Sequence, residues 1–353
     1  MIERRCPKCG GVYSDTARFC PRDGGMLVEV QTKTATPGGQ SGTGARANAP
    51  PRGPPLDRAA SLSGQLLDAR YQVSRKLGEG GMSYVYLARE VSTGDTVAIK
   101  VLSPKLARDR SSVERLRREA GLAMRLDHPN VCRILRLGES EDGLIYLVMP
   151  YLEGELLSDR ELERGPMDVA TGVALLSQMC AGLHHAHELH IVHRDLKPEN
   201  IMLVPAGGGD RAVVMDFGLA KERRADAAIQ KLTATGIILG TPEFMSPEQI
   251  RGKPLDARSD IYAIAIVAFE MFTGKLPFKG RNAQETMIAR LRGQPTPLRQ
   301  VRPELPVALE QALLRAMAPN PGDRYATALE FAEALTGNAG GGGRGGLLKK
   351  LFK

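Results

Sequence analysis

The sequence contains no tryptophan, and aromatic residues make up only 5% of its 353 residues. This scarcity does not exclude a packed core, because 42% of the residues are hydrophobic and the chain is long enough to bury a core in two lobes. Long hydrophobic runs are also missing. The apolar run Ile261–Phe269 ends before Glu270 after nine residues, whereas a membrane-spanning helix needs about 20. This run therefore predicts a buried core helix.

Cysteine is scarce too, with five residues in the chain. Cys132 and Cys180 stand far apart, and the other three lie within residues 6–20. This distribution argues against a disulfide scaffold and favours a reducing compartment. Residues 1–6 lack the apolar stretch of a signal peptide. We therefore expect a cytoplasmic protein.

An excess of positive charge is confined to the two ends of the chain. The net charge is +8; residues 1–62 contain nine basic and five acidic residues, and residues 337–353 contain four basic and no acidic ones. The intervening residues hold 35 of each sign. The central part is therefore not expected to bind nucleic acid or another polyanion.

The most informative motif lies at residues 193–200, which read His-Arg-Asp-Leu-Lys-Pro-Glu-Asn, and Asp216-Phe217-Gly218 follows. These residues supply the groups that phosphoryl transfer requires. Asp195 would accept the proton of a substrate hydroxyl, and Lys197 would neutralise charge on the transferred phosphate. Asn200 and Asp216 would hold Mg²⁺ or Mn²⁺ through hard oxygen ligands. The motif therefore predicts a phosphotransferase.

A glycine-rich segment upstream is typical of a hairpin that covers phosphates. Residues 78–85 read Gly-Glu-Gly-Gly-Met-Ser-Tyr-Val and fit G-x-G-x-x-G-x-V, except that Ser83 takes the third glycine position. Strand-like runs flank the segment at Tyr71–Leu77 and Tyr84–Arg89. Glycine's freedom at positive φ would let such a hairpin lie flat over phosphates. The run Val97-Ala98-Ile99-Lys100 then places a lysine where it would reach them.

Together these motifs resemble the eukaryotic-like (Hanks-type) serine/threonine protein kinases of bacteria, over about residues 66–336. The resemblance implies an α+β fold of two lobes: a β-rich N-lobe at 66–150 with a helix αC, and a mainly helical C-lobe at 151–336. In that family the lysine, here Lys100, pairs with a glutamate of αC. Glu119 fits this position best, and Glu114 is the alternative.

The same resemblance implies ATP as the nucleotide, with contacts from the hairpin, the strand of Lys100, a hinge near Met149–Leu152 and the start of the C-lobe. Pro150 stands where the family usually has an acidic residue, but its carbonyl and the Leu152 amide still suit an adenine ring. Met149 takes the gatekeeper position. The expected ATP contacts are Leu77, Gly78, Glu79, Gly80, Gly81, Met82, Ser83, Tyr84, Val85, Ala98, Lys100, Met149, Pro150, Leu152 and Met202.

Regulation by phosphorylation is predicted from a charge argument. Arg194 directly precedes Asp195, and a guanidinium at this place calls for a negative partner such as a phosphothreonine. Thr233 and Thr235 lie where related bacterial kinases carry a Thr-x-Thr pair. This predicts trans-autophosphorylation within a kinase homodimer, and an ordinary polar loop is the alternative.

Several structural roles follow from the resemblance alone. Asp260 would brace the catalytic loop from a buried helix, and Glu248 would pair with Arg324. Five of the six histidines fall within residues 184–193, which suggests a metal. His193 is instead expected to pack near Phe217, and we expect no metal site there. The activation and structural residues are Arg194, Phe217, Gly218, Thr241, Glu248, Asp260 and Arg324.

The N-terminus resembles a zinc ribbon at residues 1–30. Residues 6–10 read Cys-Pro-Lys-Cys-Gly and residues 20–24 read Cys-Pro-Arg-Asp-Gly, which is the spacing of two zinc knuckles with aspartate in place of the fourth cysteine. Zn²⁺ would be held by Cys6, Cys9, Cys20 and Asp23, because carboxylate oxygen also binds zinc. A degenerate knuckle with free thiols is the alternative. The module would serve dimerisation, partner docking or nucleic-acid contact.

Two further segments have biased composition. Residues 31–63 are rich in Gly, Pro, Ala, Ser and Thr and predict a disordered linker. Residues 337–353 predict a Gly-rich linker and a short basic amphipathic tail at 347–353. The tail would dock weakly to a partner or to the inner face of the membrane, and a solubilising tail is the alternative.

We therefore predict a serine/threonine protein kinase that uses ATP and Mg²⁺ or Mn²⁺ to phosphorylate proteins. Three other functions stay open. A pseudokinase scaffold would bind ATP without transfer, and a small-molecule phosphotransferase would share the nucleotide chemistry. A zinc-ribbon protein with an attached kinase would bind nucleic acid in a salt-dependent way.

Overall fold

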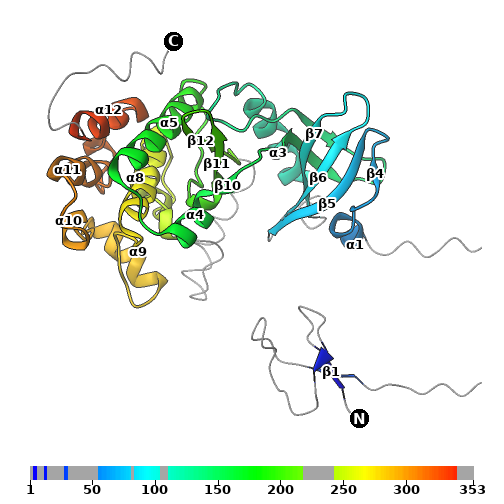
Figure 1. Cartoon of the computed structure of the whole chain (residues 1–353), viewed down its shortest axis with the longest axis horizontal. Coiled ribbons are helices and arrows are strands. Elements are labelled where there is room, and N and C mark those ends of the chain that lie inside the picture. Colours follow the sequence, from blue (N-terminus) through cyan, green and yellow to red (C-terminus); the bar gives the residue numbers. More distant parts are fainter. Residues whose placement is uncertain are drawn as a thin grey trace, which may run out of the picture. The chain divides into compact units, whose positions relative to one another are not determined.

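The computed structural model describes residues 3–5, 12–13, 28–30, 55–80, 83–103, 110–217 and 242–339. The chain forms two compact units, Met1–Arg52 and Gly53–Lys353 (Figure 1). In the first unit, β1 (Glu3–Arg5), β2 (Val12–Tyr13) and β3 (Val28–Val30) form an antiparallel sheet in the order β2-β1-β3. The residues of the expected zinc site, Cys6, Cys9, Cys20 and Asp23, lie outside the described residues.

The second unit begins with the N-lobe, an antiparallel sheet of six strands in the order β4-β5-β6-β7-β9-β8. The expected hairpin near residues 78–85 is confirmed, because β5 and β6 pair up to Gly80 and Ser83 at the turn. The strands are β4 (Leu66–Leu67), β5 (Tyr71–Gly80), β6 (Ser83–Glu90), β7 (Thr96–Leu102), β8 (Arg136–Glu139) and β9 (Ile145–Pro150).

The two faces of this sheet carry different side chains, as the alternation of residues along a strand requires. On β7, Val97, Ile99 and Val101 are buried in an outer hydrophobic core. Ala98 and Lys100 alternate with them and are half-buried on the opposite face. That second face also contributes buried residues of β9 to a core shared with α3 (Arg110–Ala123). One face of the sheet is thus buried in an apolar core, and the opposite face carries Lys100.

A short helix covers the outer core and corrects the linker predicted over residues 31–63. Helix α1 (Pro55–Ala60) precedes β4, and Ala59 and Leu62 are completely buried. The Tyr86 hydroxyl donates a hydrogen bond of 2.7 Å to the Ala59 carbonyl. Composition alone predicts disorder here, but these apolar side chains find a hydrophobic face that only the folded sheet provides. Residues 55–63 therefore belong to the folded domain, and residues 31–54 lie outside the described residues.

The C-lobe is mainly helical, and it carries one small sheet in the order β10-β11-β12. The strands are β10 (Glu155–Leu156), β11 (Ile201–Ala206) and β12 (Gly209–Val214). The 3-10 helices are η1 (Pro198–Asn200), η2 (Pro242–Phe244) and η3 (Pro321–Asp323). The α-helices are α4 (Leu157–Arg164), α5 (Val169–Glu188), α7 (Pro247–Ile250), α8 (Ala257–Thr273), α9 (Ala283–Arg292), α10 (Leu298–Val301), α11 (Val307–Ala316) and α12 (Ala328–Ala339).

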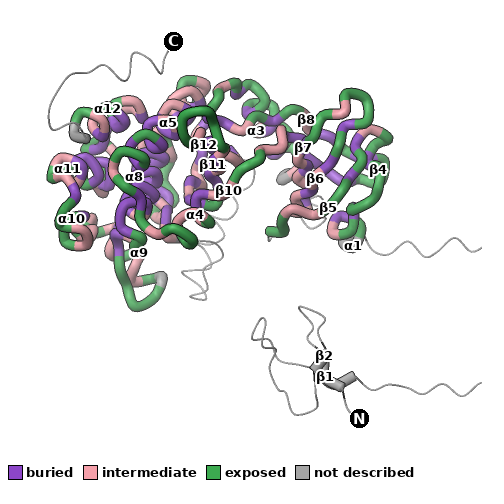
Figure 2. Tube along the Cα trace, viewed as in Figure 1, coloured by how far each residue is buried: buried purple, intermediate pink, exposed green. Residues whose placement is uncertain are grey.

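Helix α8 forms the centre of the C-lobe, and Figure 2 shows it as buried along most of its length. Every residue of the run Ile261–Phe269 is buried, which confirms the predicted core helix. Asp256 caps its first turn, and Gly274 ends it with a φ of 65°, a conformation that favours glycine. None of the helices in the described ranges is long and apolar enough to cross a membrane. Helix α12 extends to Ala339, slightly beyond the predicted end of the lobe at residue 336.

Candidate active site

Asp260 of α8 holds the backbone of the predicted catalytic loop, residues 193–200. The Asp260 carboxylate accepts hydrogen bonds from the His193 amide at 2.8 Å and from the Arg194 amide at 3.0 Å. It also lies 2.8 Å from the Nε2 atom of His187. Burial opposes ionisation of Asp260, but these hydrogen bonds outweigh it and keep its pKa below the usual value. The backbone contacts expected of Asp260 are present, its bracing role stays a prediction, and His187 is a partner that the sequence did not indicate.

The loop adopts a backbone conformation that is uncommon for residues other than glycine. Arg194 has a φ of 67° and Asp216 has a φ of 59°. Such a backbone conformation costs about 1–3 kcal/mol of folding free energy and persists where surrounding contacts fix it. Asp260 supplies such a contact at Arg194. The strain therefore lies on both segments that were predicted to hold catalytic groups.

Asn200 ties the catalytic aspartate to its own loop. The Asn200 Nδ2 atom donates to the backbone oxygen of Asp195 at 2.7 Å and to its Oδ2 atom at 3.1 Å. The amide group therefore turns its nitrogen to Asp195 and leaves its oxygen for another ligand. The Met215 amide donates to the Asn200 carbonyl at 2.8 Å, which joins the loop to the segment of Asp216. A second link runs from His193 Nε2 to the Met215 carbonyl at 2.7 Å.

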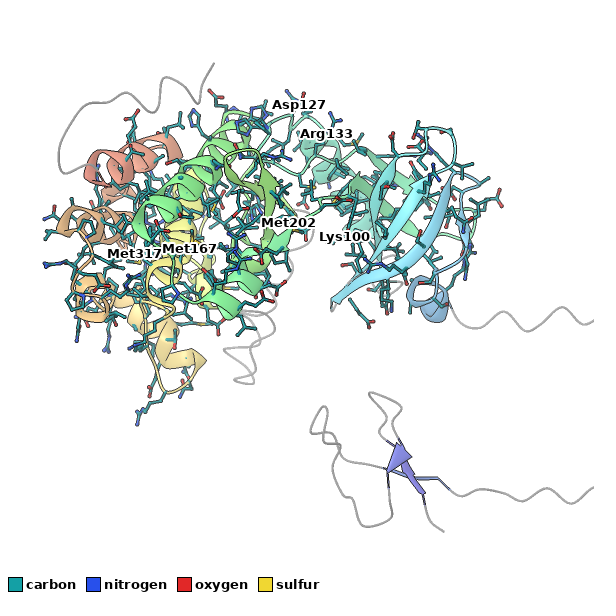
Figure 3. The ribbon with its side chains drawn as sticks, viewed as in Figure 1. Lys100, Asp127, Arg133, Met167, Met202 and Met317 are labelled. Carbon is teal, nitrogen blue, oxygen red and sulfur yellow. The ribbon has the colours of Figure 1, made fainter. Side chains whose placement is uncertain are left out.

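Lys100 connects the two lobes through Asp216. Its Nζ atom lies 2.6 Å from Oδ2 of Asp216. In Figure 3, Lys100 of β7 and Met202 of β11 lie where the lobes meet. Glu119 is half-buried on α3. Its pairing with Lys100, which the resemblance implies, stays a prediction.

The predicted adenine contacts lie on facing elements. Val85 pairs in register with Lys100, and Ala98 pairs with Met149, so their side chains share the half-buried face of the sheet. Met202 is half-buried on β11 in the C-lobe, and Pro150 and Leu152 of the hinge are half-buried as well. These residues offer apolar surface from both lobes. Gly81 and Met82 lie outside the described residues.

The hairpin glycines correct one part of the sequence argument. Gly78 and Gly80 do not adopt positive φ. A Cβ added to Gly78 would meet nothing within 4 Å, and one added to Gly80 would lie 3.9 Å from the Ser83 carbonyl. Neither the backbone nor the neighbouring atoms therefore require glycine here. The remaining reason for glycine is the close approach of a ligand to the exposed main chain.

The donor set suits magnesium. Within the described part of the chain, no three His, Cys, Asp or Glu side chains gather around a common metal position. Asp216 and Asn200 nevertheless offer one carboxylate and one amide oxygen. Mg²⁺ binds through such a small set of protein ligands and completes its shell with water and substrate phosphates.

Residues 242–250, which follow the predicted phosphorylation sites, are joined to the catalytic loop and to Arg324. Glu248 and Arg324 form the predicted ion pair, with distances of 2.7 Å and 2.8 Å, and both are buried. The Gln249 side chain donates to the Arg194 carbonyl at 2.7 Å, a link that no sequence motif predicted. Phe217 packs against His193 with ring centroids 4.7 Å apart, as expected. Gly218, Thr233, Thr235 and Thr241 lie outside the described residues.

Comparison with known proteins agrees with this geometry. The pattern that defines the protein kinase domain matches residues 71–332. The chain belongs to the protein kinase family. Curated relatives include the serine/threonine-protein kinases pkn3 of Myxococcus xanthus, 39% identical over 77% of this chain and 50% of the relative, and PrkC of Bacillus subtilis, 39% identical over 76% and 40%. The chain thus spans half or less of these relatives.

Solved structures of similar proteins support the assignment to the protein kinase family. The kinase domain of Mycobacterium tuberculosis PknI is 30% identical, with a TM-score of 0.62 over 78% of this chain and 98% of that one. This similarity agrees with the architecture described above, a β-sheet N-lobe and a helical C-lobe. The bilobal fold predicted from the sequence is therefore confirmed.

Proposed function

We propose that the protein transfers the γ-phosphoryl group of ATP to serine and threonine hydroxyls of other proteins. The main support is the hydrogen-bonded set of Asp195, Asn200 and the Met215–Asp216 segment, together with Lys100 on Asp216. No catalytic group is missing from this set, which argues against a pseudokinase. Lys197, two residues after Asp195, favours hydroxyl acceptors of the serine/threonine type by resemblance.

The chemistry follows from these residues. The substrate hydroxyl gives its proton to Asp195 while its oxygen bonds to the γ-phosphorus, and the bond to the oxygen bridging the β-phosphate breaks, releasing ADP. Asn200 orients Asp195 through its Nδ2 hydrogen bonds. Lys197 neutralises charge on the transferred group. Mg²⁺, when bound, adds positive charge beside the phosphates, and Asp216 and Asn200 would hold it.

The Lys100–Asp216 pair has to change for this chemistry. A carboxylate paired with an ammonium group is a weaker metal ligand, because the two cations compete for it. Lys100 would therefore leave Asp216 for the nucleotide phosphates, with Glu119 as its carboxylate partner.

The decisive experiment is incubation with radiolabelled ATP, Mg²⁺ and dephosphorylated casein, with the unaltered chain beside Asp195→Asn. We expect label in casein for the unaltered chain and a loss of about hundredfold or more in the variant. Asp256→Asn, an exposed cap of α8, is the control that keeps full transfer. Binding of ATP with equal labelling in both proteins would identify a pseudokinase with a contaminating activity. Labelling of small hydroxyl compounds alone would identify a small-molecule phosphotransferase.

Trans-autophosphorylation at Thr233 and Thr235 is the regulatory part of the proposal. It rests on Arg194, whose backbone Asp260 and Gln249 fix beside Asp195. A phosphothreonine would give the Arg194 guanidinium a strong negative partner. Peptide mapping of the active chain and of Asp195→Asn tests this, and an active chain with neither threonine modified contradicts it.

The terminal segments complete the proposal. Zinc at Cys6, Cys9, Cys20 and Asp23 rests on the knuckle spacing alone, and metal analysis of the chain beside a variant with Cys6 and Cys9 changed to serine tests it. Docking through residues 347–353 rests on their amphipathic pattern. Sedimentation with anionic vesicles, with and without these residues, tests it. A cytoplasmic location at the inner face of the membrane would follow from binding.

A further inference from the structure

A short segment of chain links helix α3 of the N-lobe to the C-lobe. Residues 127–132 lie between α3 and β8 in the chain, and we call them the interlobe loop. The Val214 amide of β12 donates to the Asn130 carbonyl at 2.9 Å, and the Cys132 amide donates to the Val214 carbonyl at 2.8 Å. Asp216 follows Val214 by two residues. The interlobe loop therefore connects α3 to the strand that leads to Asp216.

One face of α5 receives the interlobe loop. Gln178, Gly182 and His185 follow one another at helical spacing and so share this face. The Gln178 Oε1 atom accepts from the Asn130 side chain at 3.1 Å, and a Cβ added to Gly182 would lie 2.8 Å from the Asn130 carbonyl oxygen. The His185 ring stacks on His128, with centroids 5.4 Å apart and planes inclined by 26°. The two histidines thus extend the contact of the loop with α5 toward the end of the helix.

Both imidazole rings accept a hydrogen bond from the loop backbone. The Nδ1 atom of His128 accepts from the Asn130 amide at 3.1 Å. The Nε2 atom of His185 accepts from the Asp127 amide at 3.3 Å. A ring nitrogen that accepts a hydrogen bond carries no proton, so each ring is neutral in this arrangement. Protonation would place an N–H against each amide and two cations on stacked rings, which repel each other.

The surroundings of the histidine pair also favour neutral rings. Burial, followed by repulsion from His185, lowers the pKa of His128. The nearby charged groups are Asp127 and Arg133 (labelled in Figure 3), which lie 3.7 Å apart, His184 and Glu188 of α5, which also lie 3.7 Å apart, and Arg211 of β12, which donates to the Pro129 carbonyl at 2.8 Å. Each of these carboxylates already has a partner, and the remaining arginine opposes further positive charge.

We propose that His128 and His185 form an acid-sensitive contact: their protonation below about pH 6.5 releases the interlobe loop from α5 and lowers phosphoryl transfer. The limit follows from the ordinary pKa of histidine, about 6.5, to which the released rings return. The contact is complete above this pH and weakens as the pH falls, because the released state binds more protons. Transfer slows because β12, which leads to Asp216, loses part of its support. The effect on transfer rests on the proposed function, whereas the release of the loop does not.

The test follows the loop and the reaction separately in the full chain, at about pH 7.5 and about pH 6.0. Cys132 reports on the loop, because burial raises the pKa of its thiol to about 12 and shields it while the loop is docked. Labelling with a dithiodipyridine, which stays reactive toward thiols in acid, is located by peptide mapping. Radiolabelled ATP and dephosphorylated casein measure transfer. His185→Phe keeps a stacked ring that cannot be protonated. His190→Asn removes an exposed histidine whose φ of 59° suits asparagine, and it is the matched control.

The unaltered chain and His190→Asn should respond to acid more strongly than His185→Phe. From pH 7.5 to pH 6.0 we expect Cys132 labelling to accelerate, and casein phosphorylation to slow, by about fourfold relative to His185→Phe, because that variant lacks one titrating ring. The same pH dependence in all three proteins overturns the inference, and so does faster labelling without slower transfer.

Two further comparisons keep the test decisive. If His185→Phe does not fold, His128→Phe takes its place in the same comparison. Labelling of Cys132 in the unaltered chain that does not accelerate in acid overturns the inference without any variant. Absence of casein phosphorylation at pH 7.5 overturns the proposed function and the effect on transfer, and the labelling then decides the release of the loop alone.

Discussion

Asp260 shows how one buried carboxylate determines the shape of a catalytic loop. It accepts hydrogen bonds from the backbone amides of residues 193 and 194. At Arg194 it thereby stabilises a positive φ that would otherwise be disfavoured. Hydrogen bonds from His187 and the two backbone amides favour its charged form against burial. Asparagine at this position has the same shape but only one acceptor oxygen, so an amide nitrogen would face a backbone donor.

We therefore expect Asp260→Asn to lower both activity and stability. An unsatisfied buried donor costs about 1–3 kcal/mol, so the melting temperature should fall by several degrees, and kcat should fall because the backbone next to Asp195 is released. Calorimetry and casein phosphorylation measure the two effects. Asp256→Asn on the same helix is exposed and keeps a capping side chain, so it should change neither. An Asp260→Asn variant with full kcat would contradict the bracing role.

Glu161 of α4 lies within electrostatic range of Glu270 of α8, and among the described residues no ion pair is formed by either carboxylate. Burial, followed by the charges of Glu270 and Glu199, raises the pKa of Glu161 to about 8, and similar causes raise the pKa of Glu270 to about 7. The Oε1 atom of Glu161 has no hydrogen-bond partner within the described ranges. When the folded-state pKa of a carboxyl group is raised, the protonated group keeps its full contribution to stability below the unfolded-state pKa, about 4.3. This contribution is lost as the pH rises through the folded-state pKa.

Glu161→Gln should therefore stabilise the protein, and increasingly so between about pH 5 and pH 8. Glutamine is neutral in both states, so the variant avoids the proton uptake that folding of the unaltered chain requires. We expect a difference of about 1–3 kcal/mol near pH 8 and almost none near pH 4.5. Thermal unfolding at several pH values measures it. Glu163→Gln, exposed on the same helix, is the control, and a Glu161→Gln difference that does not vary with pH would contradict the argument.

Helix α1 depends on the sheet that it covers. Six residues are too few to form a stable helix in isolation, so its order comes from packing on the outer core of the N-lobe. Leu62 follows the helix and is completely buried in that core. The same strands carry Lys100 on their other face. Loss of the cover should therefore weaken the lobe that binds the nucleotide.

Leu62→Ala should destabilise the protein by about 3 kcal/mol, the usual cost of truncating a buried leucine. We also expect a higher KM for ATP, because β7 is less firmly held. Thermal unfolding and ATP titration of the kinase reaction measure these effects. The adjacent Ser63→Ala is exposed and should be silent. If Leu62→Ala and Ser63→Ala melt at the same temperature, α1 is not part of the folded domain.

The elements differ in how far the sequence determines them. The catalytic loop and the β5–β6 hairpin were predictable because their chemistry demands certain residue types at fixed, short spacings. Helix α8 was predictable from its apolar run. Helix α1 was not, because its composition matches a linker and its stability comes from a distant sheet. The partners of Asp260 and Lys100 illustrate the same limit, since His187 and Asp216 reach them only through the tertiary fold.

On the scale of the whole chain, both hydrophobic cores lie between Ala59 and Leu335. One core fills the outer N-lobe under α1, and the other runs from α3 through the C-lobe to α12. The predicted basic ends lie mostly beyond these limits. The kinase domain should thus fold and transfer phosphate without the terminal segments. Its N-terminal boundary should be α1 and not β4.

We therefore expect residues 55–339 to fold and to phosphorylate casein with a kcat/KM within about twofold of the full chain, because every buried contact of the described kinase domain is retained. The shorter fragment 63–339 lacks Ala59 and Leu62 and exposes the outer core, so it should melt several degrees lower. Thermal unfolding and casein labelling of both fragments beside the full chain measure this. Equal melting temperatures of the two fragments would move the domain boundary back to β4. A loss of transfer in 55–339 at an unchanged melting temperature would mean that the terminal segments act in catalysis.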